Sequence, residues 1–196
     1  MKTEKPKMYI ASCSFGKDSL ATILVALENG EPLDRVVFSE VMFDHARNIS
    51  GELPEHIAWI YETAIPELEE MGVKVDVVRA KKDYIALCKQ VLQKGKNKGK
   101  MYGVQNSKPC YANSTLKLEP IRKYISRFRK DFDVVQYVGI AADEPKRLVR
   151  LKGSNKISIL AKYGITEEMA MAKCRDYNLV SPCYSMDNRG GVLVLF

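Results

Sequence analysis

The sequence predicts an α/β fold, a three-layer and doubly wound, mostly parallel sheet, in one domain over residues 1–196. Three observations predict this fold. Short apolar runs alternate with stretches of helical periodicity along the chain, and the first run ends at a turn that contains glycine. The length of 196 residues suits a single core, and we find no internal repeat or linker that would divide it.

The predicted elements follow one another in strand–helix order. Apolar runs predict strands at residues 8–13, 33–38, 73–78 and 134–140. Helical spacing predicts helices from the first strand to Gly30, at residues 57–71 with a kink at Pro66, at 112–130 with an interruption at Pro120, and at 166–177. This alternation implies right-handed crossovers, with ligands bound beyond the carboxyl ends of the strands.

Charge and composition narrow the classes of partner. The chain has 31 Lys and Arg against 24 Asp and Glu, a net charge of +7, which favours polyanions such as nucleotides or RNA. We expect residues 92–107 to form a mobile basic loop, with solvated lysines favoured over an RNA contact at Lys94, Lys96, Lys98 and Lys100. No apolar run is long enough to cross a bilayer, and residues 1–7 are polar, so we expect a cytoplasmic protein without a membrane partner.

The best candidate site is a turn between the first strand and the first helix, formed by Ser14, Phe15, Gly16, Lys17, Asp18 and Ser19. Its backbone amides and the helix N-terminus converge on one point, and such a point attracts phosphate. Gly16 lets the backbone approach a ligand, the serines offer hydroxyls and Lys17 adds a cation. Asp18 suits a cap of the first helical turn or a ligand of Mg²⁺ carried by a nucleotide. Ala11 and Asp18 exclude a Walker loop.

This turn resembles the PP-loop of the adenine nucleotide α-hydrolase superfamily, whose ATP pyrophosphatase form reads Ser-Gly-Gly-x-Asp-Ser, with Phe15 in place of the first Gly. The Ser-Phe-Gly version resembles the loop of phosphoadenosine phosphosulfate (PAPS) reductases. Leu53-Pro54-Glu55 is similar to a Phe-Pro-Glu element of that family, and residues 139–147 to its Gly-x-x-x-x-Glu-x-x-Arg segment. The resemblance implies an adenine nucleotide α-hydrolase-like (Rossmann-like) fold, with ATP, PAPS or adenylyl sulfate as ligand and Mg²⁺ as its companion ion.

Residues after the second and fourth strands are the other candidates for the nucleotide site. Gly139 ends a strand at the ligand edge, and Arg147 offers a bidentate contact to phosphate or sulfate. Glu144 suits orientation of that arginine or contact with the ribose, with a surface ion pair as the alternative. Glu40 and Asp44 follow the second strand, where the superfamily contacts adenosine, and either could accept from a ribose hydroxyl or bind magnesium.

The histidines and three of the cysteines receive structural roles. His45 and His56 have no metal-ligand partner at useful spacing and are assigned to the surface or to packing. Cys13 and Cys88 are expected to be small buried residues, and Cys174 to lie on the inner face of the helix at 166–177. The odd total of five cysteines, with no close pair, argues against a disulfide framework.

The remaining two cysteines belong to a further resemblance. One branch of the PAPS reductase-like family carries a Lys-Cys-x-x-Asn-like segment, a Thr-Glu helix, a Pro-x-Tyr element and a C-terminal Cys-x-x-Cys-Pro. The first three correspond to Cys110 with Asn113, Thr166 with Glu167, and Pro182, Cys183 and Tyr184, whereas the cysteine pair is lacking. With such a pair, Cys110 and Cys183 could complete an iron–sulfur or zinc site. Without it, free thiols near the nucleotide are favoured, and a redox role for Cys110 stays open.

The last residues suggest a reason for the missing pair. Residues 192–195 read Val-Leu-Val-Leu, which is what codons for Cys-Trp-Phe-Cys give one base out of frame. Our hypothesis is that a one-base slip truncated an ancestor that carried Cys-x-x-Cys. The gene tests it, because the shifted frame beyond the stop codon must encode a Cys-Pro continuation.

Three functions follow from these patterns. The first is a PAPS reductase-like enzyme acting on ATP or a phosphosulfated adenylate in sulfur metabolism, with Lys17, Asp18, Arg147 and Cys110 as catalytic candidates. The second is an ATP pyrophosphatase that adenylates RNA or another substrate for thiolation or amidation. The third is a truncated, catalytically inactive nucleotide-binding module. The oligomeric state stays open.

Overall fold

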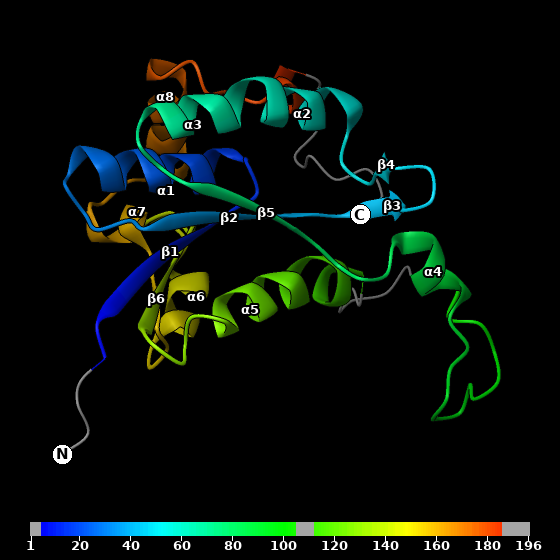
Figure 1. Ribbon diagram of the computed structural model, residues 1–196. Coiled ribbons are helices and arrows are strands. Elements are labelled where there is room, and N and C mark those ends of the chain that lie inside the picture. The colour runs from blue at the N-terminus through cyan, green and yellow to red at the C-terminus, as the bar shows by residue number, and fades with distance from the viewer. Residues whose placement is uncertain (1–4, 105–111, 186–196) are drawn as a thin grey trace.

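The computed structural model describes residues 5–104 and 112–185. Five strands form one sheet in the order β5-β2-β1-β6-β7, and every pairing in it is parallel (Figure 1). Their bounds are β1 Lys7–Cys13, β2 Arg35–Glu40, β5 Val75–Arg79, β6 Asp133–Val138 and β7 Lys156–Ile157. This is the predicted α/β, Rossmann-like architecture, with the reversal of strand order between β1 and β6.

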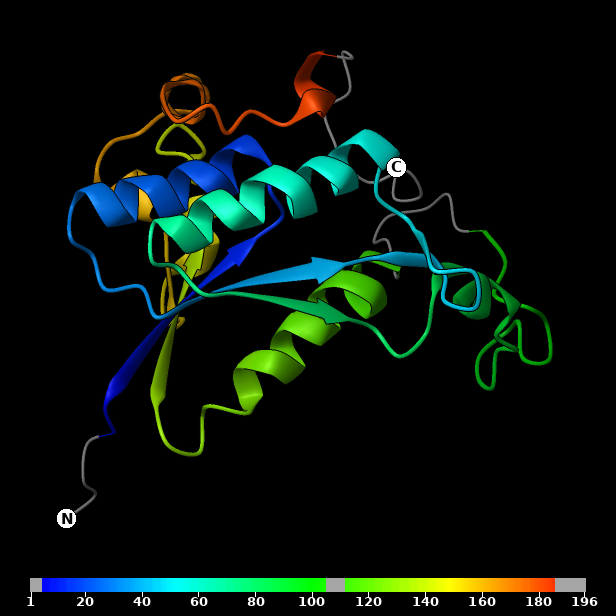
Figure 2. The same ribbon diagram turned by 45° about the horizontal axis from the view of Figure 1, so that its top comes forward.

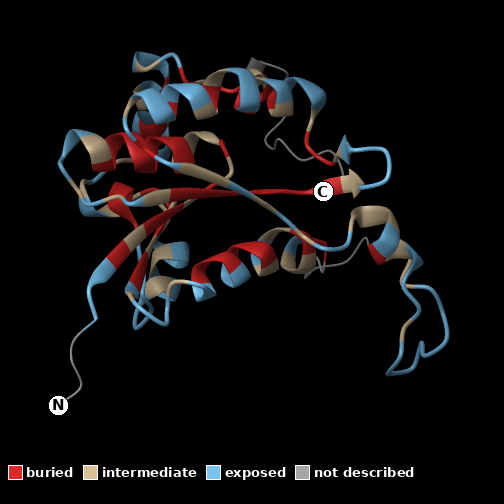
Figure 3. Cartoon of the chain, in the orientation of Figure 1, coloured by how far each residue is buried: buried red, intermediate tan, exposed pale blue. Residues whose placement is uncertain are grey.

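Helices cover both faces of the sheet, so the fold has three layers (Figures 1 and 2). On one side lie α1 (Lys17–Glu28), α2 (Pro54–Trp59), α3 (Ile65–Glu70) and α8 (Glu167–Asp176), and on the other lies α5 (Glu119–Ser126). Neighbouring residues of β1 point to opposite faces, because side chains alternate along a strand. Ala11 therefore packs in the cluster around α1, and Ile10 in the cluster around α5. Figure 3 shows both buried surfaces in red.

The kinks predicted at two prolines take the form of π-helical turns. The turn η1 (Ile60–Ala64) joins α2 to α3, whose second residue is Pro66, and η2 (Asn113–Leu118) leads into α5, whose second residue is Pro120. A proline has no N–H to donate, and its ring clashes with the carbonyl four residues earlier. A widened π turn before each proline relieves this clash, so the backbone stays helical through the proline.

Several short elements were not predicted. They are the hairpin of β3 (Met42–Asp44) and β4 (Ile49–Ser50), the edge strand β7, the helices α4 (Tyr84–Lys89), α6 (Pro145–Leu148) and α7 (Ile159–Lys162), and the 3-10 turns η3 (Val149–Leu151) and η4 (Pro182–Ser185). Elements of two to six residues show too little of a period to be recognised in sequence.

The structure differs from two predictions for the region after β5. Cys88 is only half-buried, not buried as predicted, because α4 packs through Leu87 in a small cluster apart from the main core. The expected loop at residues 92–107 is described up to residue 104. There it folds back on itself, with a bridge between Val91 and Met101 and a hydrogen bond of 2.9 Å from Leu92 N–H to the Lys100 carbonyl. The lysines of this turn are exposed.

None of the helices in the described ranges is long and apolar enough to cross a membrane.

Candidate functional site

The loop between β1 and α1 has an unusual backbone conformation at Phe15. Its φ angle is 57°, in the left-handed region that a bulky side chain adopts only under constraint. The constraint comes from the core, since Phe15 is fully buried and meets the ring of Phe38 edge-on at 5.1 Å. This is the position where the ATP pyrophosphatase motif has glycine, so the loop keeps the shape that glycine provides and adds a hydrophobic anchor.

Hydrogen bonds within the loop hold this shape. Ser19 Oγ accepts from Ser14 N–H at 3.2 Å and donates to the Gly16 carbonyl at 2.9 Å. The Ser19 hydroxyl, predicted to donate to a ligand, is therefore used inside the loop. Among the described residues, no acceptor is present for the backbone N–H of Gly16 or of Asp18. These two amides lie at the start of α1, where the helix dipole favours an anion.

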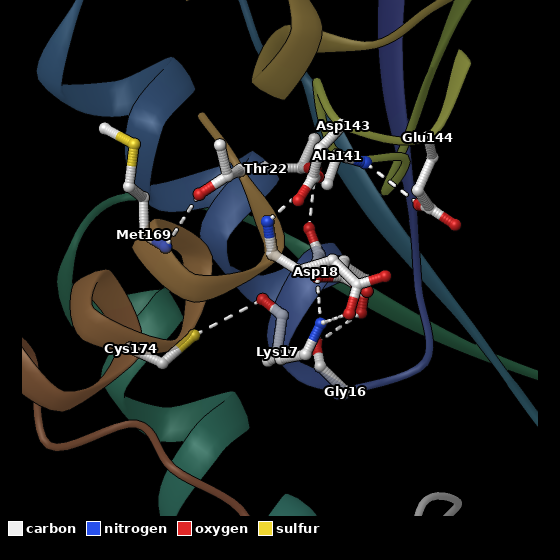
Figure 4. Close-up of polar contacts among 12 residues, drawn as sticks. Gly16, Lys17, Asp18, Thr22, Ala141, Asp143, Glu144, Met169 and Cys174 are labelled. Carbon is white, nitrogen blue, oxygen red and sulfur yellow. Dashed lines mark hydrogen bonds and ion pairs between the residues drawn. The ribbon is translucent and has the colours of Figure 1, made fainter. Parts of the chain in front are cut away.

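Lys17 and Asp18 lie side by side at the start of α1 (Figure 4). Lys17 Nζ is 2.7 Å from Asp18 Oδ1 and 3.1 Å from Glu167 Oε2 on α8. Burial by itself lowers the pKa of Lys17, but the hydrogen bonds to the two carboxylates raise it above its ordinary value. Burial raises the pKa of Asp18 and the charges of Glu167 and Glu144 add to this, although Lys17 opposes them. The loop thus combines a fixed cation with a carboxylate whose burial Lys17 offsets only in part.

The segment after β6 reaches the same edge of the sheet, because β1 and β6 are parallel neighbours. Gly139 packs directly on the first turn of α1, which gives this glycine a packing role beside its predicted contact with the nucleotide. Arg147 Nη1 donates to both carboxylate oxygens of Glu144, at 2.6 and 2.8 Å. Glu144 also accepts from Ala141 N–H (Figure 4). Glu144 therefore orients Arg147, whose side chain is half-exposed. The contact of Arg147 with phosphate stays a prediction.

Glu40 and Asp44 have structural partners. Glu40 is buried at the end of β2 and accepts from Tyr61 Oη at 2.7 Å and from Arg79 Nε at 2.8 Å, across the pairing of β2 with β5. Asp44 Oδ1 accepts from the backbone N–H groups of Ala46 and Arg47 and so closes the turn after β3. Their proposed contacts with ribose or magnesium would require these partners to be exchanged, and stay predictions.

Three buried or half-buried residues were not singled out as functional. His56 is buried, and its Nδ1 lies 2.7 Å from Ser181 Oγ. Burial lowers the pKa of His56, which favours the neutral ring. Glu52 is buried, its Oε1 has no hydrogen-bond partner within residues 5–104 and 112–185, and burial raises its pKa to about 7. Tyr184 Oη accepts from the backbone of Lys17. No sequence spacing links positions so far apart.

The described cysteines are free thiols. Burial raises the pKa of Cys13 to about 11 and that of Cys174 to about 12, so both are neutral and poor nucleophiles. Cys13 and Cys174 are buried as predicted, and Cys183 is buried near the loop. Cys110, the other candidate for a redox or metal role, lies outside the described residues. Over residues 5–104 and 112–185, no group of three or more His, Cys, Asp or Glu side chains could hold a metal ion.

The sheet is parallel and Rossmann-like, and a glycine-containing loop and a helix N-terminus lie at its topological switch point. This is the arrangement by which α/β domains bind nucleotides. No protein-family model matches the chain, and no curated protein matches its sequence. Among solved structures it is similar to the U34-tRNA thiolase NcsA from Methanococcus maripaludis with its [4Fe-4S] cluster, with 14% identity and a TM-score of 0.49. The match covers 91% of this chain but 59% of that one, so this chain spans less than two thirds of that structure.

Proposed function

We propose that this chain is a PP-loop enzyme that binds ATP and splits it between the α and β phosphates, transferring the adenylyl group to an acceptor. The observation that carries the proposal is the loop itself. Phe15, in its left-handed conformation, leads the chain into the N-terminus of α1, where the amides of Gly16 and Asp18 have no acceptor among the described residues and Lys17 supplies a cation. These groups suit the oxygens of a polyphosphate better than any neutral ligand.

The charge around Asp18 favours ATP over a phosphosulfate. Asp18 and Glu167 place negative charge next to an anion site, and a divalent cation relieves that repulsion. Because the described residues offer no three-ligand metal site, Mg²⁺ would arrive on the nucleotide phosphates, with Asp18 as its protein ligand. When bound, the ion would neutralise charge on the phosphates.

The residues of this chain would act by position and charge. An acceptor oxygen attacks the α-phosphorus, the bond to the bridging oxygen breaks, and pyrophosphate leaves. The amides of Gly16 and Asp18 together with Lys17 would stabilise the charge that develops on the phosphate oxygens. Arg147, oriented by Glu144, is the second cation for this charge.

Calorimetry with Mg-ATP, adenylyl sulfate and PAPS, combined with an assay of pyrophosphate release, tests this function. We expect ATP to bind and Lys17→Met to weaken it by about 10- to 100-fold, the range for a charged hydrogen bond. Lys173→Met is the matched control, because Lys173 lies on α8 and pairs with Glu28. If none of the three nucleotides binds, the proposal is wrong.

The same experiment separates the two rival functions. A PAPS reductase-like enzyme would bind PAPS or adenylyl sulfate in preference to ATP. The Ser-Phe-Gly loop favours it, whereas its candidate thiol, Cys110, lies outside the described residues. An inactive nucleotide-binding module would bind ATP without releasing pyrophosphate in the presence of any acceptor.

RNA is the acceptor that the basic turn at residues 94–100 would favour. Its exposed lysines are Lys94, Lys96, Lys98 and Lys100. RNA binding through them would weaken as salt rises, because each phosphate contact releases a counterion. Replacing the four lysines by glutamine should reduce binding of a short RNA at low salt and flatten its salt dependence. An unchanged affinity would remove this surface from the proposal.

A further inference from the structure

The turn η4 lies against the candidate phosphate loop, although 167 positions separate the two residues that join them. The backbone N–H of Lys17, the first residue of α1, donates to Tyr184 Oη at 2.8 Å. A β-carbon at position 16 would lie 3.3 Å from the same oxygen. Gly16 therefore leaves the space in which the tyrosine hydroxyl meets the helix N-terminus.

A second contact holds this turn in place. Ser181 Oγ lies 2.7 Å from His56 Nδ1 and accepts from Cys183 N–H at 3.3 Å. The backbone of Ser14 in the loop raises the pKa of His56 against the larger effect of burial, so this histidine lies beside the loop. Ser181, Cys183 and His56 are all buried. The turn that carries Tyr184 is thus anchored through Ser181 to His56.

The Tyr184 hydroxyl retains a hydrogen to donate. Its oxygen accepts from Lys17, and within the described ranges its O–H donates to no acceptor. Burial raises the pKa of Tyr184, so the phenol keeps its proton at neutral pH. A hydroxyl that accepts from a helix amide becomes a stronger donor, because linked hydrogen bonds polarise one another. An acceptor with negative charge is the complement of such a group.

We infer that Tyr184 is a phosphate-binding residue of the nucleotide site. Its hydroxyl relays the hydrogen bond from the Lys17 amide to a phosphate oxygen, and so extends the positive end of α1 toward the ligand. The turn at 182–185 then forms one wall of the phosphate site. This inference rests on the proposed function and adds to it a residue from the opposite end of the chain.

The opposite role for Tyr184 would be that of a competitor, which occupies the Lys17 amide until a phosphate displaces it. The two roles differ in the sign of one measurement. Removal of a phosphate donor weakens nucleotide binding, whereas removal of a competitor strengthens it. Tyr184→Phe deletes only the hydroxyl and therefore distinguishes them.

The experiment is calorimetric titration of the whole chain, wild type and Tyr184→Phe, with Mg-ATP and with adenosine. We expect Tyr184→Phe to bind ATP about 10-fold more weakly, as for a lost hydrogen bond to a charged group, and adenosine as the wild type does. Tyr177→Phe is the matched control, because that hydroxyl donates to Glu28 on the outer side of α1. Equal melting temperatures would exclude a general loss of folding.

Unchanged or tighter ATP binding by Tyr184→Phe would overturn the inference while leaving the proposed function intact. Equal weakening of ATP and adenosine would also overturn it, since the effect would then not concern phosphate. A wild-type chain that binds no nucleotide removes the proposed function and this inference together. If Tyr184→Phe melts early, Ser181→Ala serves instead: freeing the turn from His56 should weaken ATP binding and spare adenosine binding.

Discussion

The backbone of Gly139 touches that of Ser19, because a β-carbon on Gly139 would lie 2.7 Å from the Ser19 nitrogen and 2.8 Å from the carbonyl carbon of Asp18. The end of β6 and the first turn of α1 therefore meet without room for a methyl group. The atoms in the way are backbone and cannot move aside separately from the helix. This contact fixes the candidate phosphate loop against the segment that carries Glu144 and Arg147.

Gly139→Ala should destabilise the protein by about 1–3 kcal/mol, the range for an added methyl group in a packed interior. It should also weaken ATP binding, because the first turn of α1 must shift. Urea unfolding and calorimetry measure the two effects. Gly164→Ala is the control: its φ of 69° makes the substitution strained, but nothing lies within 4 Å of the new methyl group. Gly164→Ala should therefore lose stability without losing nucleotide affinity.

The left-handed backbone of Phe15 should set the order of stability of its Ala and Gly variants. Phe15→Ala and Phe15→Gly both lose a fully buried ring, which destabilises by about 3–5 kcal/mol. Phe15→Gly should nevertheless be the more stable of the two by about 1 kcal/mol, because only glycine adopts a φ of 57° without strain.

The control for this prediction is the partner ring. Phe38 lies in the extended strand β2, where glycine has no conformational advantage, so Phe38→Gly should be less stable than Phe38→Ala. Denaturant unfolding of the four variants gives the comparison. If the Gly variant is less stable than the Ala variant at both positions, the left-handed conformation of Phe15 does not determine the stability of its variants.

Glu52 should make stability fall as pH rises. Burial raises its pKa from 4.5 to about 7 in the folded protein, so the folded state holds a proton that the unfolded state releases near pH 4.5. Between these values the folded state binds more protons, and the free energy of unfolding declines by about 3 kcal/mol as the pH rises. Glu52→Gln has no proton to lose and should flatten this dependence.

Urea unfolding between pH 5 and pH 8 measures the effect as the difference between wild type and variant. Glu55→Gln, an exposed change three residues further along the chain, is the control and should follow the wild-type pH dependence. A Glu52→Gln variant with that dependence would mean that the Glu52 carboxyl is already ionised below pH 5.

The long elements could be predicted because the hydrophobic pattern of a strand or helix repeats several times within each of them. The strand at Lys7–Cys13, the helix that follows it and the buried Cys174 on α8 are where the sequence pattern predicts them. Pro66 and Pro120 predicted interruptions, since the missing N–H is a local property. The edge strand β7, with two exposed residues, has no such pattern and depends on Gln136 and Tyr137 of β6 for its pairing.

The sequence by itself determined the α/β class and the composition of the candidate phosphate loop, because both rest on residues that are neighbours along the chain. Only the tertiary structure decided the partners of that loop. The contacts of Lys17 with Glu167 and Tyr184, and of Gly139 with Ser19, join residues more than a hundred positions apart. The physical reason is that parallel strands bring their carboxyl ends to one edge, whereas the packing of α8 and η4 against that edge selects which side chains meet there.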